Sequence, residues 1–168
     1  MFVLSIRENG INCDKTNYRP ISLLPILSKL FEKIIFDVLY DYLTQNSLLV
    51  SCLSGFLQGD LCVSQLLSIN HSVYGNLNSN PSLDTKAIFL DLSKAFDKVW
   101  HEGLIHKLKS YKIEGKLLNL LKNYLEDRKQ RVVINGTGSS WKNVHASVTR
   151  GSVLGPLLFL IFINDLPE

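Results

Sequence analysis

A short apolar run that contains a single acid constrains this chain most. Residues 88–92 place the carboxylate of Asp91 directly after three apolar residues and before Leu92. Such a run predicts a buried strand that carries one acid at its end. A buried carboxylate is costly unless something pairs with it, and a hard divalent cation such as Mg²⁺ is a suitable partner. The alternative is that Asp91 is the N-cap of a short helix that begins at Ser93, because Asp is a favoured N-cap.

The composition is typical of one folded domain that spans residues 1–168. A chain of 168 residues with 46% hydrophobic content is long enough for one core and short for two. The formal net charge of +3 permits binding to a polyanion without demanding it. Cys13, Cys52 and Cys62 have no metal-ligand spacing, which favours free thiols in a reducing compartment.

No segment predicts secretion or membrane insertion. The first six residues are followed at once by Arg7 and Glu8, so the amino terminus is too short and too soon charged for a signal peptide. The longest apolar run, residues 153–163, is well under the roughly 20 residues that a bilayer span requires. We therefore expect an intracellular protein, nuclear or cytoplasmic, with no membrane partner.

Helical periodicity dominates the first half of the chain. A long amphipathic helix is predicted from about residue 23 to residue 45, with Pro25 in its first turn. Its apolar stripe, which we expect in the core, comprises Leu24, Leu27, Leu30, Phe31, Ile34, Ile35, Val38 and Tyr42. A second helix is expected from Asp60, as its N-cap, to about residue 77. The polar residues 75–82 then predict a loop before the strand of Asp91.

The second half mixes helical and strand patterns. Two helices are predicted over residues 102–111 and 116–127, with a turn at Gly115 between them. Residues 130–135 and 141–148 predict the two arms of a hairpin, and a last helix is expected over about residues 155–164. With no repeats or clear linkers, these elements predict a fold of the α+β class.

Four motifs of the sequence occur in the order and spacing that one known family shows. They are Asn17-Tyr-Arg-Pro-Ile-Ser-Leu-Leu24, Ser54-Gly-Phe56 with Gly59-Asp60, the run from Phe89 to His101, and Gly151-Ser-Val-Leu-Gly-Pro-Leu-Leu-Phe159 with Ile163-Asn-Asp-Leu-Pro167. Together they resemble the reverse transcriptase domain of non-LTR retrotransposons, the LINE-like elements of jockey and CR1 type. The resemblance implies the fingers and a partial palm of a right-hand polymerase. It assigns about residues 1–85 mainly to the fingers, and about 86–168 to the palm with further fingers and palm elements.

The resemblance also implies a catalytic metal site. Asp91 is implied as the first catalytic aspartate, which would hold Mg²⁺ or Mn²⁺ together with the backbone carbonyl oxygen of Leu92. Arg19 is implied to hold the nucleotide triphosphate, since the guanidinium fork of arginine suits phosphate oxygens. Without the motif around it, Arg19 would be read as a solvated surface residue.

The aromatic residue of the third motif has two readings. Phe96 is implied as the steric gate that fills the space of a ribonucleotide 2′-hydroxyl group, and the alternative is a core Phe on a short helix. Asp97 points about 100° away on a helix, so we do not expect it to share the metal. It is expected to be a surface or ion-pairing acid near Lys94 or His101.

Two of the motifs depart from the family's pattern. Thr149 and Arg150 stand where the family commonly has Pro-Gln before Gly151, beside the nucleotide or template. Arg150 therefore either supplies a phosphate contact there, next to Gly151, or disrupts the fit. Leu57 stands where a basic residue or Gln is common. Both departures are expected in turns, where they leave the fold intact.

The family's second aspartate motif is missing from the sequence. No Asp-Asp pair occurs, and the chain stops at Glu168. We therefore expect a truncated domain that is inactive alone, because a two-metal site needs several ligands. The strand of Asp91 would also lack its neighbour, and unpaired strand edges invite association.

Two classes of function follow from these observations. The first is a module of an RNA-directed DNA polymerase that binds an RNA template, a DNA primer and deoxynucleoside triphosphates, and transfers nucleotides with two metals. The second is a non-catalytic relic that binds nucleic acid through its Lys and Arg side chains or has no function. The number of carboxylates available to the metal distinguishes the two classes.

Overall fold

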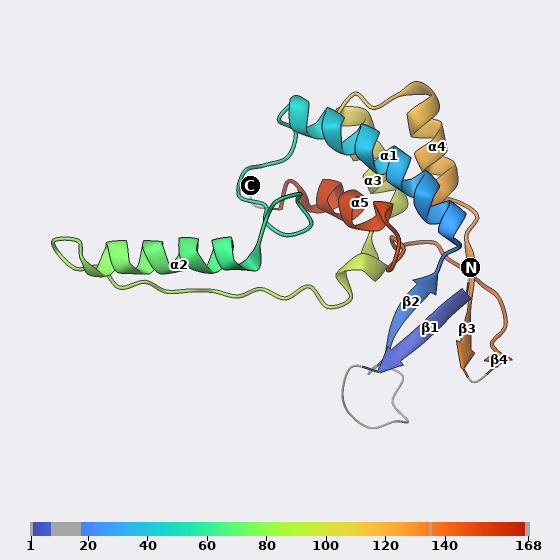
Figure 1. Ribbon diagram of the computed structural model, residues 1–168, viewed down its shortest axis with the longest axis horizontal. Helices are drawn as coiled ribbons and strands as arrows, with labels where there is room; N and C mark the ends of the chain where they lie inside the picture. The colour runs from blue at the N-terminus through green and yellow to red at the C-terminus, as the bar shows by residue number, and fades with distance from the viewer. Residues whose placement is uncertain (1, 8–17, 135, 167–168) are drawn as a thin grey trace. The chain divides into compact units, whose positions relative to one another are not determined.

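The computed structural model describes residues 2–7, 18–134 and 136–166 (Figure 1). The chain forms two compact units. The larger consists of residues 1–50 with 94–168, and the smaller consists of residues 51–93.

Four helices build the core of the larger unit. They are α1 (Ile26–Gln45), α3 (His101–Ser110), α4 (Gly115–Leu125) and α5 (Leu154–Ile163). α5 packs against α1 and α3, and α3 also packs against α4 (Figure 1). Leu157, Leu158 and Ile161 of α5 are all fully buried, as expected for a helix that is apolar on every side. The predicted helices over 102–111, 116–127 and about 155–164 are thus confirmed.

A small mixed sheet completes the larger unit. It contains β1 (Phe2–Arg7), β2 (Tyr18–Leu23), β3 (Lys129–Ile134), β4 (Thr137–Gly138) and β5 (Lys142–Asn143). The strand order is β2-β1-β3-β4, and β5 also pairs with β3. β1 is antiparallel to β2 and parallel to β3. Helices together with a sheet confirm the predicted mixed content of an α+β protein.

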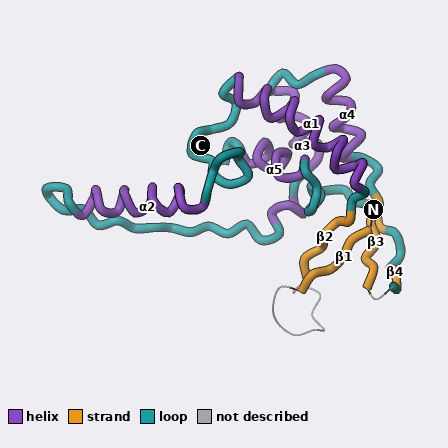
Figure 2. Tube along the Cα trace, in the orientation of Figure 1, coloured by secondary structure: helices purple, strands orange, loops and turns teal. Residues whose placement is uncertain are grey.

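The smaller unit contains one helix and a long loop. α2 (Cys62–Leu77) has no buried residue. Residues 83–92 after it form neither helix nor strand (Figure 2). Cys52 and Cys62 are exposed free thiols, and Cys13 lies outside the described residues. Across the parts of the chain that the structure describes, no helix is long and apolar enough to cross a membrane.

The predicted strand around Asp91 is wrong. Phe89 and Leu90 are 87% and 90% exposed, and among the described residues no strand pairs with this segment. A strand needs a neighbour to satisfy its backbone groups, and a local apolar pattern cannot supply one. The alternative of an Asp91 N-cap is also wrong, because the 3₁₀ helix η2 (Ala95–Lys98) is preceded by Lys94 and has no side-chain cap. Because this segment is not a strand, the prediction that it has an unpaired strand edge is also wrong.

The predicted core stripe of α1 is only partly correct. The buried residues are Glu32, Ile35, Leu39 and Leu43. Of the predicted stripe, Tyr42 is half-buried and packs against the core, and Leu24, which precedes the helix, is half-buried. More than half of the surface is exposed at Leu27, Leu30, Phe31, Ile34 and Val38. Apolar residues cover more than one face of α1. The face that becomes core is set by the packing against α5, which periodicity alone does not reveal.

Two local predictions also need correction. Asp60 is not the N-cap of α2, since Leu61 occupies that position. Asp60 instead accepts hydrogen bonds from the Ser54 hydroxyl and, at 2.7 Å, from the Gly55 N–H, and these bonds lower the pKa of Asp60. The predicted hairpin begins as expected with β3, but the short strands β4 and β5 replace a continuous second arm over residues 141–148.

Candidate nucleotide site

The loop of Arg150 and Gly151 lies directly against strand β2. The backbone N–H of Ser22 donates to the carbonyl oxygen of Arg150 at 3.0 Å. Gly151 has φ +88°, and a Cβ atom built on it would lie 3.0 Å from the carbonyl oxygen of Ser22. Only glycine combines this backbone conformation with so close an approach. The segment that carries Arg19 is thereby brought beside the segment that carries Arg150, although the side chain of Arg19 lies outside the described part.

A second contact brings η2 to the same loop. The N–H of Val148 donates to the carbonyl oxygen of Phe96 at 3.0 Å, and the N–H of Ser147 donates to that of Val99 at 2.9 Å. His101 adds a bond from Nε2 to the carbonyl oxygen of Ser147 at 2.8 Å. These bonds fix η2 along the chain that leads into Arg150. Three of the predicted nucleotide-binding segments therefore meet in the larger unit.

The Arg150 side chain is held by Asp97. Its Nη2 lies 3.3 Å from Oδ2 of Asp97, and the side chain of Arg150 is only 19% exposed. Asp97 is an ion-pairing acid as predicted, but its partner is Arg150 and not Lys94 or His101. The two residues are far apart in the sequence, so a local pattern does not reveal that they pair. The signal that could have found it is an unusual Arg in one motif together with an acid in another.

Phe96 lies at the edge of the hydrophobic core. Its ring stacks on that of Phe159 with a centroid distance of 4.5 Å and an interplanar angle of 20°. The side chain is half-buried and packs against the core cluster. This position agrees with the reading as a core Phe. It leaves part of the ring accessible, so the role of a steric gate stays a prediction.

Asp91 and Leu92 belong to the smaller unit. Both are exposed, on the loop that follows α2. A carboxylate and a backbone carbonyl are hard oxygen donors of the kind that Mg²⁺ binds, yet a magnesium ion takes about six ligands. Within the described residues, no group of three or more His, Cys, Asp or Glu side chains could hold a metal ion. The described residues therefore do not form a metal centre by themselves.

A buried acid that the sequence patterns did not single out positions the loop of Gly151. Glu32 of α1 is 3% exposed, and its Oε2 accepts hydrogen bonds from the N–H groups of Val153 at 2.7 Å and Leu154 at 3.3 Å. These are the first N–H groups of α5, so Glu32 caps that helix from another helix. Its Oε1 accepts from the Tyr124 hydroxyl at 3.1 Å, and burial raises the pKa of Tyr124. The sequence signal that could have identified Glu32 is its helical spacing with Ile35, Leu39 and Leu43, which puts an acid on the buried face of α1.

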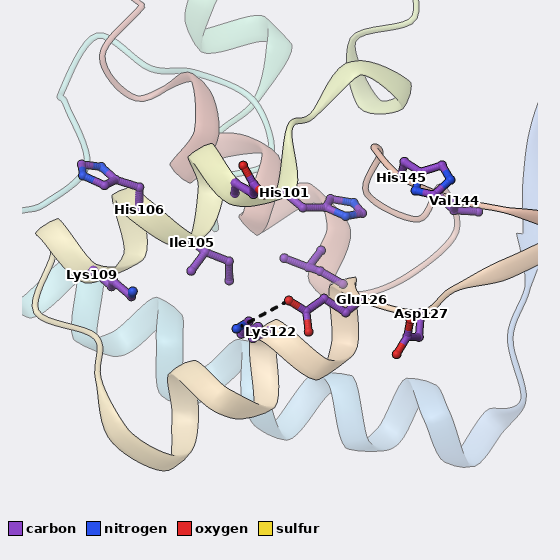
Figure 3. Close-up of a pocket in the computed structure, with 11 residues that line it drawn as sticks. His101, Ile105, His106, Lys109, Lys122, Glu126, Asp127, Val144 and His145 are labelled. Atoms are coloured by element: carbon purple, nitrogen blue, oxygen red, sulfur yellow. Dashed lines mark ion pairs between the residues drawn. The ribbon is translucent and has the colours of Figure 1, made fainter.

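The larger unit also contains a pocket of about 570 Å³ beside α3 and α4 (Figure 3). It is lined by three histidines, by acids and by lysines, including the Lys122–Glu126 ion pair at 3.7 Å. Side chains of both signs of charge line it, so the lining does not point to an anion or to a cation. None of the predicted nucleotide-binding or metal-binding residues lines it.

The comparisons with known proteins agree with the motifs. Residues 6–168 match the family described as reverse transcriptase (RNA-dependent DNA polymerase). The chain therefore belongs to the reverse transcriptase family.

Similar proteins include three polymerases of mobile elements from Drosophila melanogaster. The chain is 40% identical over 151 residues to the probable RNA-directed DNA polymerase from transposon BS, covering 90% of this chain and 16% of that protein. It is 36% identical over 155 residues to the probable RNA-directed DNA polymerase from transposon X-element, covering 92% of this chain and 17% of that protein. It is 35% identical over 167 residues to the RNA-directed DNA polymerase from mobile element jockey, covering 98% of this chain and 18% of that protein. The predicted resemblance to non-LTR reverse transcriptases is confirmed, and the chain spans less than a fifth of the length of these relatives.

Proposed function

We propose that this chain is the nucleotide-contacting part of an RNA-directed DNA polymerase of a non-LTR retrotransposon. The observation that carries the proposal is the meeting of three segments, β2, η2 and the Arg150–Gly151 loop, which come from separate motifs. Membership of the reverse transcriptase family supports the same activity. The substrates would be an RNA template, a DNA primer and deoxynucleoside triphosphates. The site of action would be inside the cell, in the nucleus or cytoplasm.

Each predicted site residue has a proposed role. Arg19 would hold the triphosphate, and Gly151 would let the backbone approach the nucleotide closely. Arg150 is already paired with Asp97, so it would offer a partly neutralised contact instead of a full positive charge. Asp91 and the carbonyl of Leu92 would contribute to a Mg²⁺ or Mn²⁺ site whose remaining ligands come from elsewhere. The division into fingers over about residues 1–85 and partial palm over about 86–168 is part of the same proposal.

One observation favours the alternative of a non-catalytic relic that binds nucleic acid or has no function. The described residues offer no group of acids that could hold a metal ion, and two-metal nucleotidyl transfer depends on such a group. The two functions predict the same fold. They differ in whether this segment supports catalysis when the rest of a polymerase is supplied.

A chimaera tests the proposal. The chain would replace the matching segment of the jockey polymerase of Drosophila melanogaster, to which it is 35% identical over 167 residues. We expect Mg²⁺-dependent extension of a DNA primer on an RNA template, measured by incorporation of labelled nucleotides, and no extension by the isolated chain. The control is a jockey polymerase from which the segment is deleted. A folded chimaera that binds the primer-template but extends nothing, even with Arg150→Gln to restore the common residue type, would favour the relic.

Sugar selectivity tests the role of Phe96. If its exposed edge meets the sugar of the incoming nucleotide, Phe96→Val in the chimaera should raise ribonucleotide incorporation relative to deoxyribonucleotide incorporation about tenfold, since shape discrimination at one contact is worth about 1–3 kcal/mol. The matched control is Phe159→Leu, which removes the stacking partner of Phe96 without touching the gate. Both variants should melt at lower temperature, but only the first should change selectivity. Equal selectivity in the two variants would leave Phe96 as a core residue.

A further inference from the structure

We propose that one face of the β3–β5 hairpin is a binding surface for single-stranded nucleic acid. The face consists of Lys129, Arg131, Trp141 and Asn143, and we call it the hairpin face. It lies in the larger unit, and none of its residues was assigned a role by the motifs. The inference rests on the proposed function only in the choice of ligand, because a polymerase must hold a single-stranded template.

The strand register places these residues together. Lys129 pairs with Asn143, and Gln130 pairs with Lys142 in antiparallel β3 and β5. Directly opposed residues share a face and successive residues alternate, so Lys142 lies on the opposite face from Lys129. Arg131 follows Lys129 by two residues in β3 and so lies on the same face. Its guanidinium carbon is 4.9 Å from the centre of the Trp141 ring, which places Trp141 on that face as well.

The hairpin region carries charge of one sign. No acidic residue occurs in the sequence between Asp127 and Asp165, whereas Lys129 and Arg131 of the hairpin face are basic. Lys129 and Trp141 are exposed, and Trp141 keeps 48% of its surface accessible while it stacks with Arg131. Basic side chains gathered on one face attract phosphates, and their potential extends over roughly a Debye length.

An exposed tryptophan in such a strip fits a single strand better than a duplex. Unpaired bases offer their faces for stacking on an aromatic ring, and an arginine beside the ring adds a cation–π contribution. In a duplex the base faces are covered, so Trp141 would have no comparable partner. Arg131 also lies against Gly138, where an added Cβ would be 3.4 Å from its Nη1.

Binding to oligonucleotides tests the hairpin face directly. The full 168-residue chain would be titrated, without metal or nucleotide, into fluorescein-labelled 20-mers of oligo(U), oligo(dT) and a mixed-sequence duplex, with fluorescence anisotropy as the readout. We expect both single strands to bind more tightly than the duplex. Trp141→Ala should weaken single-strand binding about tenfold or more, from the loss of base stacking. Tighter binding of oligo(U) would indicate contact with the 2′-hydroxyl groups, and equal binding would indicate contact with bases and phosphates alone; both results support the proposal.

Matched variants separate the charge from the ring. Lys129→Ala should make the negative slope of log K against log salt less steep by about 0.7, the value for one phosphate contact on a single strand. Arg131→Lys keeps the charge but loses the guanidinium group over the Trp141 ring, so it should weaken binding without changing the slope. Lys142→Ala, on the opposite face, is the control and should change the affinity least. The chain has two tryptophans, so the Trp100→Phe variant reports on Trp141 alone, and its fluorescence should be quenched by oligo(U).

Two results would overturn the proposal. One is binding of the single strands by Trp141→Ala and Lys129→Ala with the affinity of the unaltered chain. The other is a duplex bound as tightly as oligo(U) or oligo(dT). Circular dichroism and thermal melting would confirm that each variant is folded before its affinity is interpreted. These measurements need no catalysis, so failure here would leave the chimaera test of polymerase function unaffected.

Discussion

In the jockey chimaera, Asp91→Asn should lower the rate of primer extension by a factor on the order of 10² or more. Metal ions supply several kcal/mol of transition-state stabilisation in reactions of this class, and each 1.36 kcal/mol corresponds to a factor of ten. An amide is neutral, and therefore a poorer ligand for Mg²⁺ than a carboxylate. Steady-state incorporation of labelled nucleotides would measure the rate, and binding of the primer-template should change little.

The same loop supplies the control for this experiment. Asp84 is also an exposed aspartate in residues 83–92 of the smaller unit. Asp84→Asn makes the same chemical change nearby, and we expect it to leave the extension rate within about twofold. If the two variants lost activity equally, the loss would reflect the charge of the loop and not a specific role of Asp91. Full activity of Asp91→Asn would refute the assignment of Asp91.

The helices were predictable because their patterns are local. In α5, apolar residues on every side favour a buried helix, and in α3 and α4 the helical spacing predicts the correct segments. α1 shows the limit of this reasoning. Its end at Gln45 was predicted correctly, but its start was not, because Pro25 is the N-cap and residues 18–23 form strand β2. The choice between two apolar faces depends on α5, which lies over a hundred residues further along the chain.

The site was predictable only as a set of segments. Motif order brought together the residues of β2, η2 and the Arg150–Gly151 loop, which the structure confirms as neighbours. The contacts between them were not predictable, because the pairing of Arg150 with Asp97 requires both the turn at Gly151 and the hydrogen bonds that hold η2. The strand predicted at Asp91 failed for a related reason. Its apolar pattern predicts a buried strand, but among the described residues no neighbouring strand pairs with it.

Glu32→Ala should destabilise the larger unit by about 3 kcal/mol or more. The carboxylate accepts hydrogen bonds from Val153, Leu154 and Tyr124 at a site that is 3% exposed. Removing it leaves buried N–H groups without their charged acceptor, and hydrogen bonds to charged groups are worth about 1.5–3 kcal/mol each. Glu32→Gln keeps an acceptor oxygen but loses the charge, so we expect an intermediate loss. Chemical denaturation monitored by circular dichroism would measure the free energy of unfolding.

A second acid on α1 serves as the reference for Glu32. Asp37 lies five residues later and makes an exposed ion pair with Lys33 at 2.6 Å. Exposed pairs of this kind contribute about 0.3–0.5 kcal/mol, so Asp37→Ala should change stability by no more than that. A similar loss in both variants would mean that helix charge, not the buried cap, accounts for the effect of Glu32. If Glu32→Ala alone is destabilised, the loop of Arg150 and Gly151 is held in place by a contact between α1 and the start of α5. The proposed nucleotide site would then depend on the packing of these two helices as well as on its own motifs.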